Sequence, residues 1–441
     1  MKRKGNWILI LGLIIVASIL GIIFPGSGNF DIDPNINTGD TAWMLTATAL
    51  VLLMTPGLGF FYGGMIHPRH IISTILQSFI AMGIVSVLWI IVGFSVAFGD
   101  DIGGVIGNPA TFFMFRGVNG FTNADLAPTI PLALFAMFQL KFAIITPALI
   151  TGSFAGRVRF KAYMLFICLF TIFIYAPLAH MTWHPGGLLR NWGVLDFAGG
   201  TVVHMSAGFA ALAGAIFLGK RKDYTKQIQP ANIPFVLLGA GLLWFGWFGF
   251  NAGSALAANS TATLALLNTN TASAAAMLAY IFFDAATGKK PSAMGASVGL
   301  VVGLVAITPA AGFVSVGASI FIGVFASILS NLAIRYFSHR SGIDDTLDVF
   351  PAHGLGGITG MILTAVFANG VGLIYGHTKT FLFHLLALVI VGIFTFGGSY
   401  ILYWITNKII GMRVSPNSEK VGLDISQHDE AYAFEYKSLS E

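Results

Sequence analysis

The sequence predicts an all-α membrane protein that crosses a bilayer many times, and three observations lead to this prediction. Hydrophobic residues make up 56% of the 441 residues and charged residues only 9%, too few to cover a water-soluble surface of this size. Apolar stretches of helix length recur along the chain, and a span needs about 20 such residues. A β-barrel would instead show alternating segments of about ten residues.

Eleven apolar stretches follow one another along the chain, and each is expected to form a core transmembrane helix. Together they define a membrane domain at residues 40–410. The stretches cover 42–65, 71–98, 130–154, 162–180, 196–219, 233–257, 260–283, 292–309, 313–336, 347–369 and 381–407.

Residues 1–28 form a separate segment with a basic start followed by an apolar stretch. Two interpretations stay open. The segment fits a signal peptide with a weak small-residue cleavage site at 26–28, and it equally fits an additional N-terminal span that is not cleaved. In both cases the segment begins inside the cell and delivers Trp43 to the outside, so the topology of the eleven core spans is the same.

The distribution of basic residues predicts the orientation, because cytoplasmic loops carry an excess of Lys and Arg. One set of alternate loops carries Arg69, Arg157, Arg159, Lys161, Lys220, Arg221, Lys222, Lys226, Lys289, Lys290, Arg335 and Arg340. The other loops carry only Arg116, Arg190 and Lys379. The first set is therefore expected in the cytoplasm. The polar tail at 411–441 ends on the same side of the cell membrane and contains all the glutamates of the chain.

A short pattern, D-x7-H-x3-G, occurs twice in the chain. The copies are Asp196–His204–Gly208 in the fifth span and Asp345–His353–Gly357 in the tenth. Because five spans separate the copies, they run through the membrane in opposite directions, as the halves of an inverted repeat do. The fold class predicted is therefore a five-plus-five inverted repeat of helices, completed by a last helix.

The spacing inside each copy also predicts where its polar groups lie. Eight helical residues rise about 12 Å, so each histidine lies about two turns deeper than its aspartate. Asp196 is expected to accept backbone N–H bonds at the start of its helix. His204 and His353 enter the hydrocarbon from opposite sides, and unpaired polar rings are costly there. We therefore expect the two imidazoles to meet and to have a functional role.

Several long motifs carry a resemblance to a known family. They are FQLKFAIITPALI at 138–150, DFAGGTVVH at 196–204, GWFGFNAGS at 246–254, DVFPAHG at 348–354, and GMRV with GLDISQHDEAYA in the tail. In this order they closely resemble the bacterial ammonium transporter (Amt/Rh) family over residues 40–433. The resemblance implies a homotrimer in membrane lipid with one pore per subunit. It also implies uptake of ammonium, with methylammonium as an analogue, and a PII-type signalling protein at the cytoplasmic face. No enzyme activity, cofactor, metal or nucleic acid is implied.

The same resemblance assigns roles to individual residues. Carried over by motif, they are Trp183, Phe142 and Ser254 with nearby Asp196 for recruitment, Phe142 and Phe250 for the gate, and His204, His353, Phe138 and Trp247 along the pore. These residue types suit the task, because aromatic faces attract a cation and Ser254 can accept a hydrogen bond that ammonium donates and potassium cannot. An intact cation is heavily penalised in an apolar lumen, whereas neutral ammonia is not.

Other interpretations remain. The fold could serve as an ammonium sensor that signals through the tail with little flux. An intramembrane enzyme would need a nucleophile or a metal triad, and the sequence contains no H-E-x-x-H or G-x-S-x-G motif and no paired intramembrane aspartates. A gas channel of the Rh type is disfavoured by the aromatic residues of the recruitment site and by the tail motif. We interpret His180 and His184 as structural or interfacial.

Lys141 is the unusual residue of the third span, because it lies beside Phe142 where a small or apolar residue is expected. A charge at this depth is costly unless it is paired, snorkels or loses its proton. We expect Lys141 to turn away toward a subunit interface and the outer surface, or to be neutral. The alternative is a pore that Lys141 tunes or slows.

Overall fold

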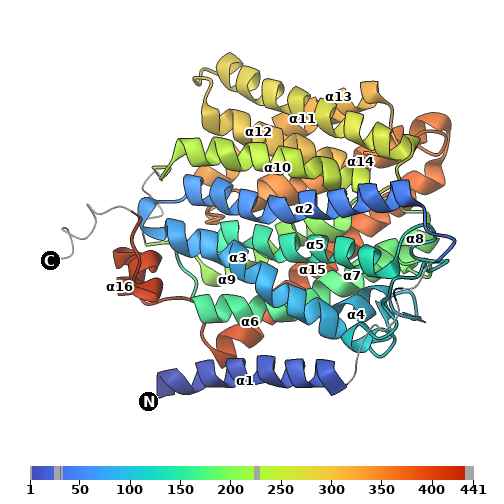
Figure 1. Ribbon diagram of the computed structural model, residues 1–441. Coiled ribbons are helices and arrows are strands. Elements are labelled where there is room, and N and C mark those ends of the chain that lie inside the picture. The colour runs from blue at the N-terminus through green and yellow to red at the C-terminus, as the bar shows by residue number, and fades with distance from the viewer. Residues whose placement is uncertain (1, 24–29, 31–32, 223–228, 433–441) are drawn as a thin grey trace.

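The computed structural model describes residues 2–23, 30, 33–222 and 229–432, and most of them are helical (Figure 1). In this part of the chain the strands are short: β1 (Asp101–Ile102) pairs antiparallel with β2 (Ile106–Gly107). The α-helices are α1 (Lys2–Ile23), α2 (Thr38–Met65), α3 (Ile71–Leu88), α4 (Phe94–Phe98), α5 (Leu132–Ile150), α6 (Phe160–Phe170), α7 (Ala176–Trp183), α8 (Leu188–Asn191), α9 (Ser206–Leu218), α10 (Ile233–Gly253), α11 (Ser260–Ala286), α12 (Ala293–Ile307), α13 (Val316–His339), α14 (Leu355–Phe367), α15 (Thr378–Ile409) and α16 (Pro416–Val421).

Short π-helical and 3-10 turns continue several of these helices without breaking the rod. The π turns are Trp89–Gly93, Thr171–Tyr175, Gly200–Met205, Phe350–Gly354 and Asp424–His428, and the 3-10 turns are Pro68–His70, Phe113–Phe115, Thr151–Phe154 and Leu373–Tyr375. Extra residues inserted in a helical turn often mark functional positions. Two of the π turns contain His204 and His353, so the histidines of the repeated pattern stand where the helical geometry changes.

Among the described residues, ten helical stretches are long and apolar enough to cross a membrane. Nine of them coincide, within a few residues at each end, with predicted apolar stretches. The tenth, Phe160–Asn191, continues well past the predicted stretch 162–180. The remaining predicted stretch is α12, whose 15 residues span about 22 Å, less than the hydrocarbon thickness of about 30 Å. The multi-span helical class is therefore confirmed, whereas the count of eleven spans depends on α12.

The long helices run side by side between two ends of the bundle (Figure 1). One end carries α16, and we call it the tail face. The other carries α4 and α8, and we call it the vestibule face. Helix α1 lies at the edge of the bundle and begins at the tail face. Its described side chains, such as Leu11 and Ile22, are largely exposed, so α1 contributes little to the core.

Glycines allow a close contact between helices α2 and α10. A Cβ on Gly64 would lie 2.7 Å from the backbone N of Val236, and one on Gly57 would lie 2.9 Å from Cβ of Leu242. Small residues at such positions let helices approach closely where lipid provides no hydrophobic driving force. The arrangement fixes α10, which carries Trp247 and Phe250 of the predicted site.

The first part of the C-terminal tail docks on the tail face. The backbone N–H of Arg159 donates to the carbonyl of Met412 at 2.8 Å, and that of Val414 donates to the carbonyl of Arg157 at 3.0 Å. The side chain of Arg157 is fully buried. Burial lowers the pKa of Arg157 to about 10, with the nearby charge of Asp344 opposing this shift.

Farther along the tail, the carboxylate of Asp424 caps the start of α3. It accepts hydrogen bonds from the backbone N–H groups of Ile72 at 3.0 Å and Ser73 at 2.8 Å. Burial raises the pKa of Asp424 to about 6, although these two backbone bonds oppose the shift. The tail is therefore held by a group that titrates near neutral pH.

Candidate functional site: a vestibule, an aromatic constriction and a histidine pair

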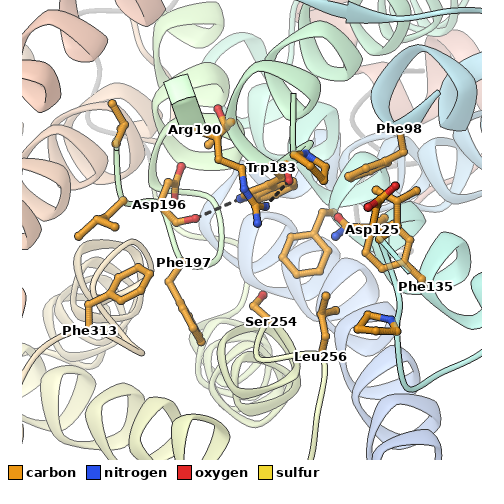
Figure 2. Close-up of a pocket in the computed structure, with 18 of the residues that line it drawn as sticks. Phe98, Asp125, Phe135, Trp183, Arg190, Asp196, Phe197, Ser254, Leu256 and Phe313 are labelled. Carbon is orange, nitrogen blue, oxygen red and sulfur yellow. Dashed lines mark hydrogen bonds between the residues drawn. The ribbon is translucent and has the colours of Figure 1, made fainter. Parts of the chain in front are cut away.

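A cavity of about 440 Å³ lies at the vestibule face, where α5, α7 and α10 converge. Figure 2 shows its lining, which mixes aromatic and polar side chains. The four residues predicted for recruitment all border it: Phe142, Trp183, Asp196 and Ser254. The structure thus brings together residues from four separate parts of the sequence at one opening.

Trp183, the last residue of α7, is held from two sides (Figure 2). Its indole Nε1–H donates to the backbone carbonyl of Asp196 at 3.1 Å. Its own backbone carbonyl accepts a bond from Nη1 of Arg190 at 2.6 Å. The indole therefore has a fixed orientation at the edge of the vestibule, where its face can contact a cation.

Asp196 borders the vestibule, but both oxygens of its carboxylate accept hydrogen bonds from the residues that follow it. One oxygen accepts the N–H groups of Gly199 at 2.8 Å and Gly200 at 2.6 Å, and the other accepts the N–H of Thr201 at 2.7 Å and its hydroxyl. Gly199 adopts a φ of 118°, a conformation that suits glycine. Asp196 thus caps the helix that carries His204, as expected from its position in the sequence.

Ser254 follows α10 and presents a hydroxyl oxygen to the vestibule. Its Oγ–H donates to the carbonyl of Phe250 at 2.9 Å. A hydroxyl has one proton and two lone pairs, so this bond leaves the lone pairs of Ser254 available to accept. A ligand that donates hydrogen bonds, and not one that only accepts them, suits this position.

An aromatic constriction closes the floor of the vestibule. The rings of Phe142 and Phe250 lie 4.3 Å apart between centroids at 33°, and both are buried. Phe138 packs at 5.0 Å on Phe142 from one helical turn away, and Trp183 meets the same ring edge-on at 5.7 Å. The two packed rings therefore separate the vestibule from the histidines below.

The two histidines lie directly below the constriction. Nδ1 of His204 is 3.4 Å from Nδ1 of His353, and the rings stack at 24° with centroids 5.5 Å apart. Trp247 covers His204 at 5.3 Å and is anchored through Nε1 to Oγ1 of Thr308 at 2.9 Å. A hydrogen bond between the two Nδ1 atoms requires one neutral ring to be protonated on Nδ1 and the other on Nε2.

This tautomer pairing makes the two remaining ring nitrogens different. If His204 donates, its Nε2 is an acceptor and Nε2 of His353 is a donor; if His353 donates, the roles are exchanged. Nε2 of His204 is buried and has no hydrogen-bond partner among the described residues. Buried polar atoms are normally satisfied, so this nitrogen is suited to a small molecule in the lumen.

The lumen around the histidines is narrow. A space of about 10 Å³ is lined by His204, His353, Trp247 and Phe250 with apolar neighbours, and one of about 20 Å³ continues past His353 toward the tail face. Each can hold about one water-sized molecule. A hydrated cation does not fit, whereas a single small neutral molecule does.

The sequence analysis missed several polar residues along this path. Asp348 lines the inner space with a φ of 57°, a conformation uncommon outside glycine. Asp348 is the first residue of the motif DVFPAHG and follows Asp345 by three positions. This position in the motif could have identified it as a candidate site residue. In the vestibule, Asp125, Gln139 and Arg190 also line the cavity. Oε1 of Gln139 is buried without a partner among the described residues.

Lys141 lies outside this path. It borders neither the vestibule nor the two inner spaces. Its side chain is buried, with 7% of its surface exposed, and it forms no hydrogen bond or ion pair within the described chain. The residue therefore lies beside the described spaces without lining them, and its burial shows that it does not reach the outer surface to which it was expected to turn.

Comparisons with known proteins match the chain over nearly all of its length. The family model described as Ammonium Transporter Family matches residues 42–433. An ammonium transporter of Aquifex aeolicus is 48% identical, covering 90% of this chain and 94% of its own. Mep2 of Saccharomyces cerevisiae is 33% identical with a TM-score of 0.83 and covers 88% of this chain and 91% of its own. A structure named as a sensor Amt protein is 30% identical with a TM-score of 0.81, covering 88% and 98%.

Proposed function

The chain belongs to the Ammonium Transporter Family, and from this premise we propose that it takes up ammonium across the cell membrane by recruiting the cation and passing ammonia through the pore. The observation that carries the mechanism is the sequence of vestibule, aromatic constriction and histidine pair along one path. In this proposal the vestibule face is outside the cell and the tail face is cytoplasmic.

Recruitment is assigned to Trp183, Phe142 and Ser254. A cation near an aromatic face gains about 0.5–2 kcal/mol as solvent is removed, and ammonium can donate one of its protons to the free lone pairs of Ser254. Potassium has no proton to donate, so this contact favours ammonium between two ions of similar size. Asp196 is a positioning residue, because its carboxylate is consumed by the cap and its carbonyl orients Trp183.

Deprotonation precedes passage of the gate: water in the vestibule takes up the proton and ammonia keeps the electron pair. We propose that this proton crosses the membrane separately from ammonia, so that each ammonium taken up moves one charge. The spaces below Phe142 and Phe250 hold about one water-sized molecule, and an unhydrated charge there would be strongly penalised. Ammonia is neutral and both donates and accepts hydrogen bonds. It can therefore move past the gate and contact the ring nitrogens of His204 and His353, while Phe138 and Trp247 keep the lining apolar.

We further propose that the core is a five-plus-five inverted repeat, with α15 as the last helix and α12 as one of eleven spans. A reciprocal glycine contact supports this. A Cβ on Gly208 would overlap the backbone of Gly354, the residue after His353. A Cβ on Gly357 would lie 3.1 Å from the backbone N of Met205, the residue after His204. The glycine of each D-x7-H-x3-G copy thus contacts the residue that follows the histidine of the other copy.

The remaining assignments concern the parts around the pore. We propose residues 40–410 as the membrane domain in a homotrimer and residues 411–441 as a cytoplasmic regulatory tail that helps a PII-type protein block the pore. Residues 1–28 remain a signal peptide or an additional span. The docking of Val414 and Asp424 on the tail face supports a tail that senses or alters the pore helices.

A current measurement on proteoliposomes tests the function. An ammonium pulse should give a saturable current that potassium and sodium pulses do not give, and methylammonium should give a smaller one. Ser254→Ala should raise the half-saturating ammonium concentration at least threefold, whereas Ser260→Ala, at the exposed start of α11, should not. Ammonium binding with neither current nor methylammonium uptake would reject transport in favour of a sensor.

A further inference from the structure

A cluster of three metal-ligating side chains lies at the vestibule face beside the cavity. It consists of Asp101 at the start of β1, His180 near the end of α7 and His184, which directly follows α7. One ligand atom from each residue can be chosen so that all lie within 4.8 Å of one another. The proposed transport path uses none of these three side chains.

His180 stands between two hydrogen-bond acceptors. Its Nδ1 is 3.0 Å from the carbonyl oxygen of Ala97, and its Nε2 is 2.9 Å from Oδ1 of Asp101. A neutral imidazole has one N–H, so it can satisfy only one of the two. The ring is fully buried. A neutral ring therefore leaves one of the two acceptors without a proton, and a cation bound between Nε2 and Asp101 would satisfy both sides of the ring.

The bond to Ala97 favours the metal ion. When Nδ1–H donates to this carbonyl, the lone pair on Nε2 points at Asp101. Histidines that bind metals commonly donate their other ring N–H to a backbone carbonyl, which fixes the tautomer and the ring orientation. The second contact of a metal-binding histidine is thus already present in the protein.

His184 supplies the second imidazole. It lies four residues after His180, and the two rings stack at 4.3 Å and 14°. Its Nδ1 accepts the N–H of Gly186 at 3.0 Å. Binding a metal through Nε2 would move the ring proton to Nδ1 and release this N–H, so a moderate affinity is expected. The three ligand atoms would also move inward, because ligands about 2.0–2.1 Å from a tetrahedral zinc lie about 3.3 Å apart.

Asp101 supplies the negative charge and the access from water. Its Oδ1 also accepts the N–H of Gly104 at 2.7 Å, which orients the carboxylate. About a third of the Asp101 side chain is exposed, so an ion can reach the cluster from the solvent.

We propose that Asp101, His180 and His184 bind one divalent transition-metal ion, for which Zn²⁺ is the suitable probe. Two imidazoles and one carboxylate form a common zinc ligand set, with the fourth position left to water. The ion would connect β1 to the end of α7. Trp183 lies between the two histidines in the chain, so the ion would also restrain the tryptophan of the vestibule.

Calorimetric titration of the full-length protein in detergent, with any affinity tag removed, tests this site. Zn²⁺ at pH 7.5 should bind one ion per subunit with micromolar affinity, and Mg²⁺ should not bind. Asp101→Asn and His184→Ala should each weaken Zn²⁺ binding at least tenfold. Both side chains are partly exposed, so these variants should keep the melting temperature of the unmodified protein.

His377→Ala provides the matched control, because His377 is an exposed histidine outside the cluster and its loss should leave binding unchanged. Lowering the pH to 5.5 should weaken binding at least tenfold, since protons compete for the two imidazoles; the charged groups facing His184 besides Asp101 and His180 are Arg190 and Asp125. No Zn²⁺ binding to the unmodified protein, or equal binding to all three variants, would overturn the proposal. Neither result depends on ammonium transport.

Discussion

The two aspartate–histidine segments share a sequence pattern but satisfy their carboxylates differently. Asp196 accepts four hydrogen bonds from three residues that follow it. Asp345 accepts a bond from the N–H of Phe350 at 2.7 Å, while its Oδ1 is buried without a partner among the described residues. Burial raises the pKa of Asp345 to about 6. In the vestibule half the aspartate forms a fully hydrogen-bonded cap, whereas in the tail half one carboxylate oxygen has no hydrogen-bond partner.

This difference shows how one pattern can serve two purposes. At the vestibule face the cap holds both the helix of His204 and, through the Asp196 carbonyl, the indole of Trp183. At the tail face the partly satisfied Asp345 lies near Asp348, whose backbone is strained. Strained and under-satisfied groups commonly gather where a structure must change. We infer that the vestibule half keeps a fixed geometry and that the tail half tolerates movement.

Breaking the contact that joins the two segments should have the largest effect. In Gly208→Ala the added methyl group overlaps the backbone of Gly354, which cannot retreat without displacing His353. We expect ammonium current to fall at least a hundredfold. Gly241→Ala is the control, because nothing lies within 4 Å of its added Cβ. Full current in Gly208→Ala protein would show that the segments do not cross as described.

Exchanging each carboxylate for an amide compares the two halves directly. Asp196→Asn replaces one carboxylate oxygen by an NH₂ group that faces N–H donors. This should lower the free energy of unfolding by about 1–3 kcal/mol and reduce methylammonium uptake at least tenfold. In Asp345→Asn the NH₂ group can take the place of Oδ1, which has no partner among the described residues. The free energy of unfolding should therefore fall by less than about 1 kcal/mol. Thermal unfolding and uptake of both variants are the measurements. Equal losses would remove the distinction between a rigid and a tolerant half.

The tail half should also respond to pH through Asp424. Its pKa is raised from 3.8 to about 6 when the tail is docked, so the docked state binds the proton more strongly. The carboxyl therefore favours docking most at low pH, and this contribution is lost as the pH rises through about 6. Hydrogen exchange at residues 423–429 should show less protection at pH 7.5 than at pH 5.

Asp424→Asn isolates this effect from that of His428, whose pKa burial lowers and which acts in the opposite direction. Hydrogen-exchange protection should be measured against pH for the unmodified protein and for Asp424→Asn. The difference in protection between the two proteins should decline as the pH rises. A difference that rises with pH instead would mean that the bonds from Ile72 and Ser73 outweigh burial.

The smallest effect is expected from Lys141, which lies in the vestibule half but outside the path. Lys141→Met removes a buried amine without a partner and should raise the melting temperature by about 2–4 °C. Ammonium current should change less than twofold, because Lys141 borders none of the pore spaces. A several-fold gain in current would show instead that Lys141 slows the pore.

Local patterns predicted much of this molecule. Apolar stretches located the spans because burial in lipid demands long apolar helices. The position of Asp196 at a helix start predicted its cap, since the N–H groups of a first turn need acceptors. The histidine pair was foreseen from spacing alone, because two polar rings at mid-depth need partners.

Contacts between distant segments were not predictable in the same way. The pair Asp101 and His180 is separated by 79 positions, and nothing in the local sequence indicates that a hairpin brings them together. The overlap of Gly208 with Gly354 depends on how two helices cross, which no single stretch encodes. One oxygen of Asp345 has no hydrogen-bond partner in the described part of the chain, whereas both oxygens of Asp196 have partners. This difference depends on the backbone conformation of the residues that follow each aspartate.

Replacing both histidines tests the central claim most directly. Proteoliposomes containing the His204→Ala/His353→Ala variant should be compared with the unmodified protein for methylammonium uptake, ammonium current and potassium current, after equal melting temperatures have been verified. The proposed pore predicts at least a tenfold loss of uptake, or entry of potassium, because the ring nitrogens that guide ammonia and close the lumen are gone. Unchanged ammonium flux together with unchanged exclusion of potassium would contradict it.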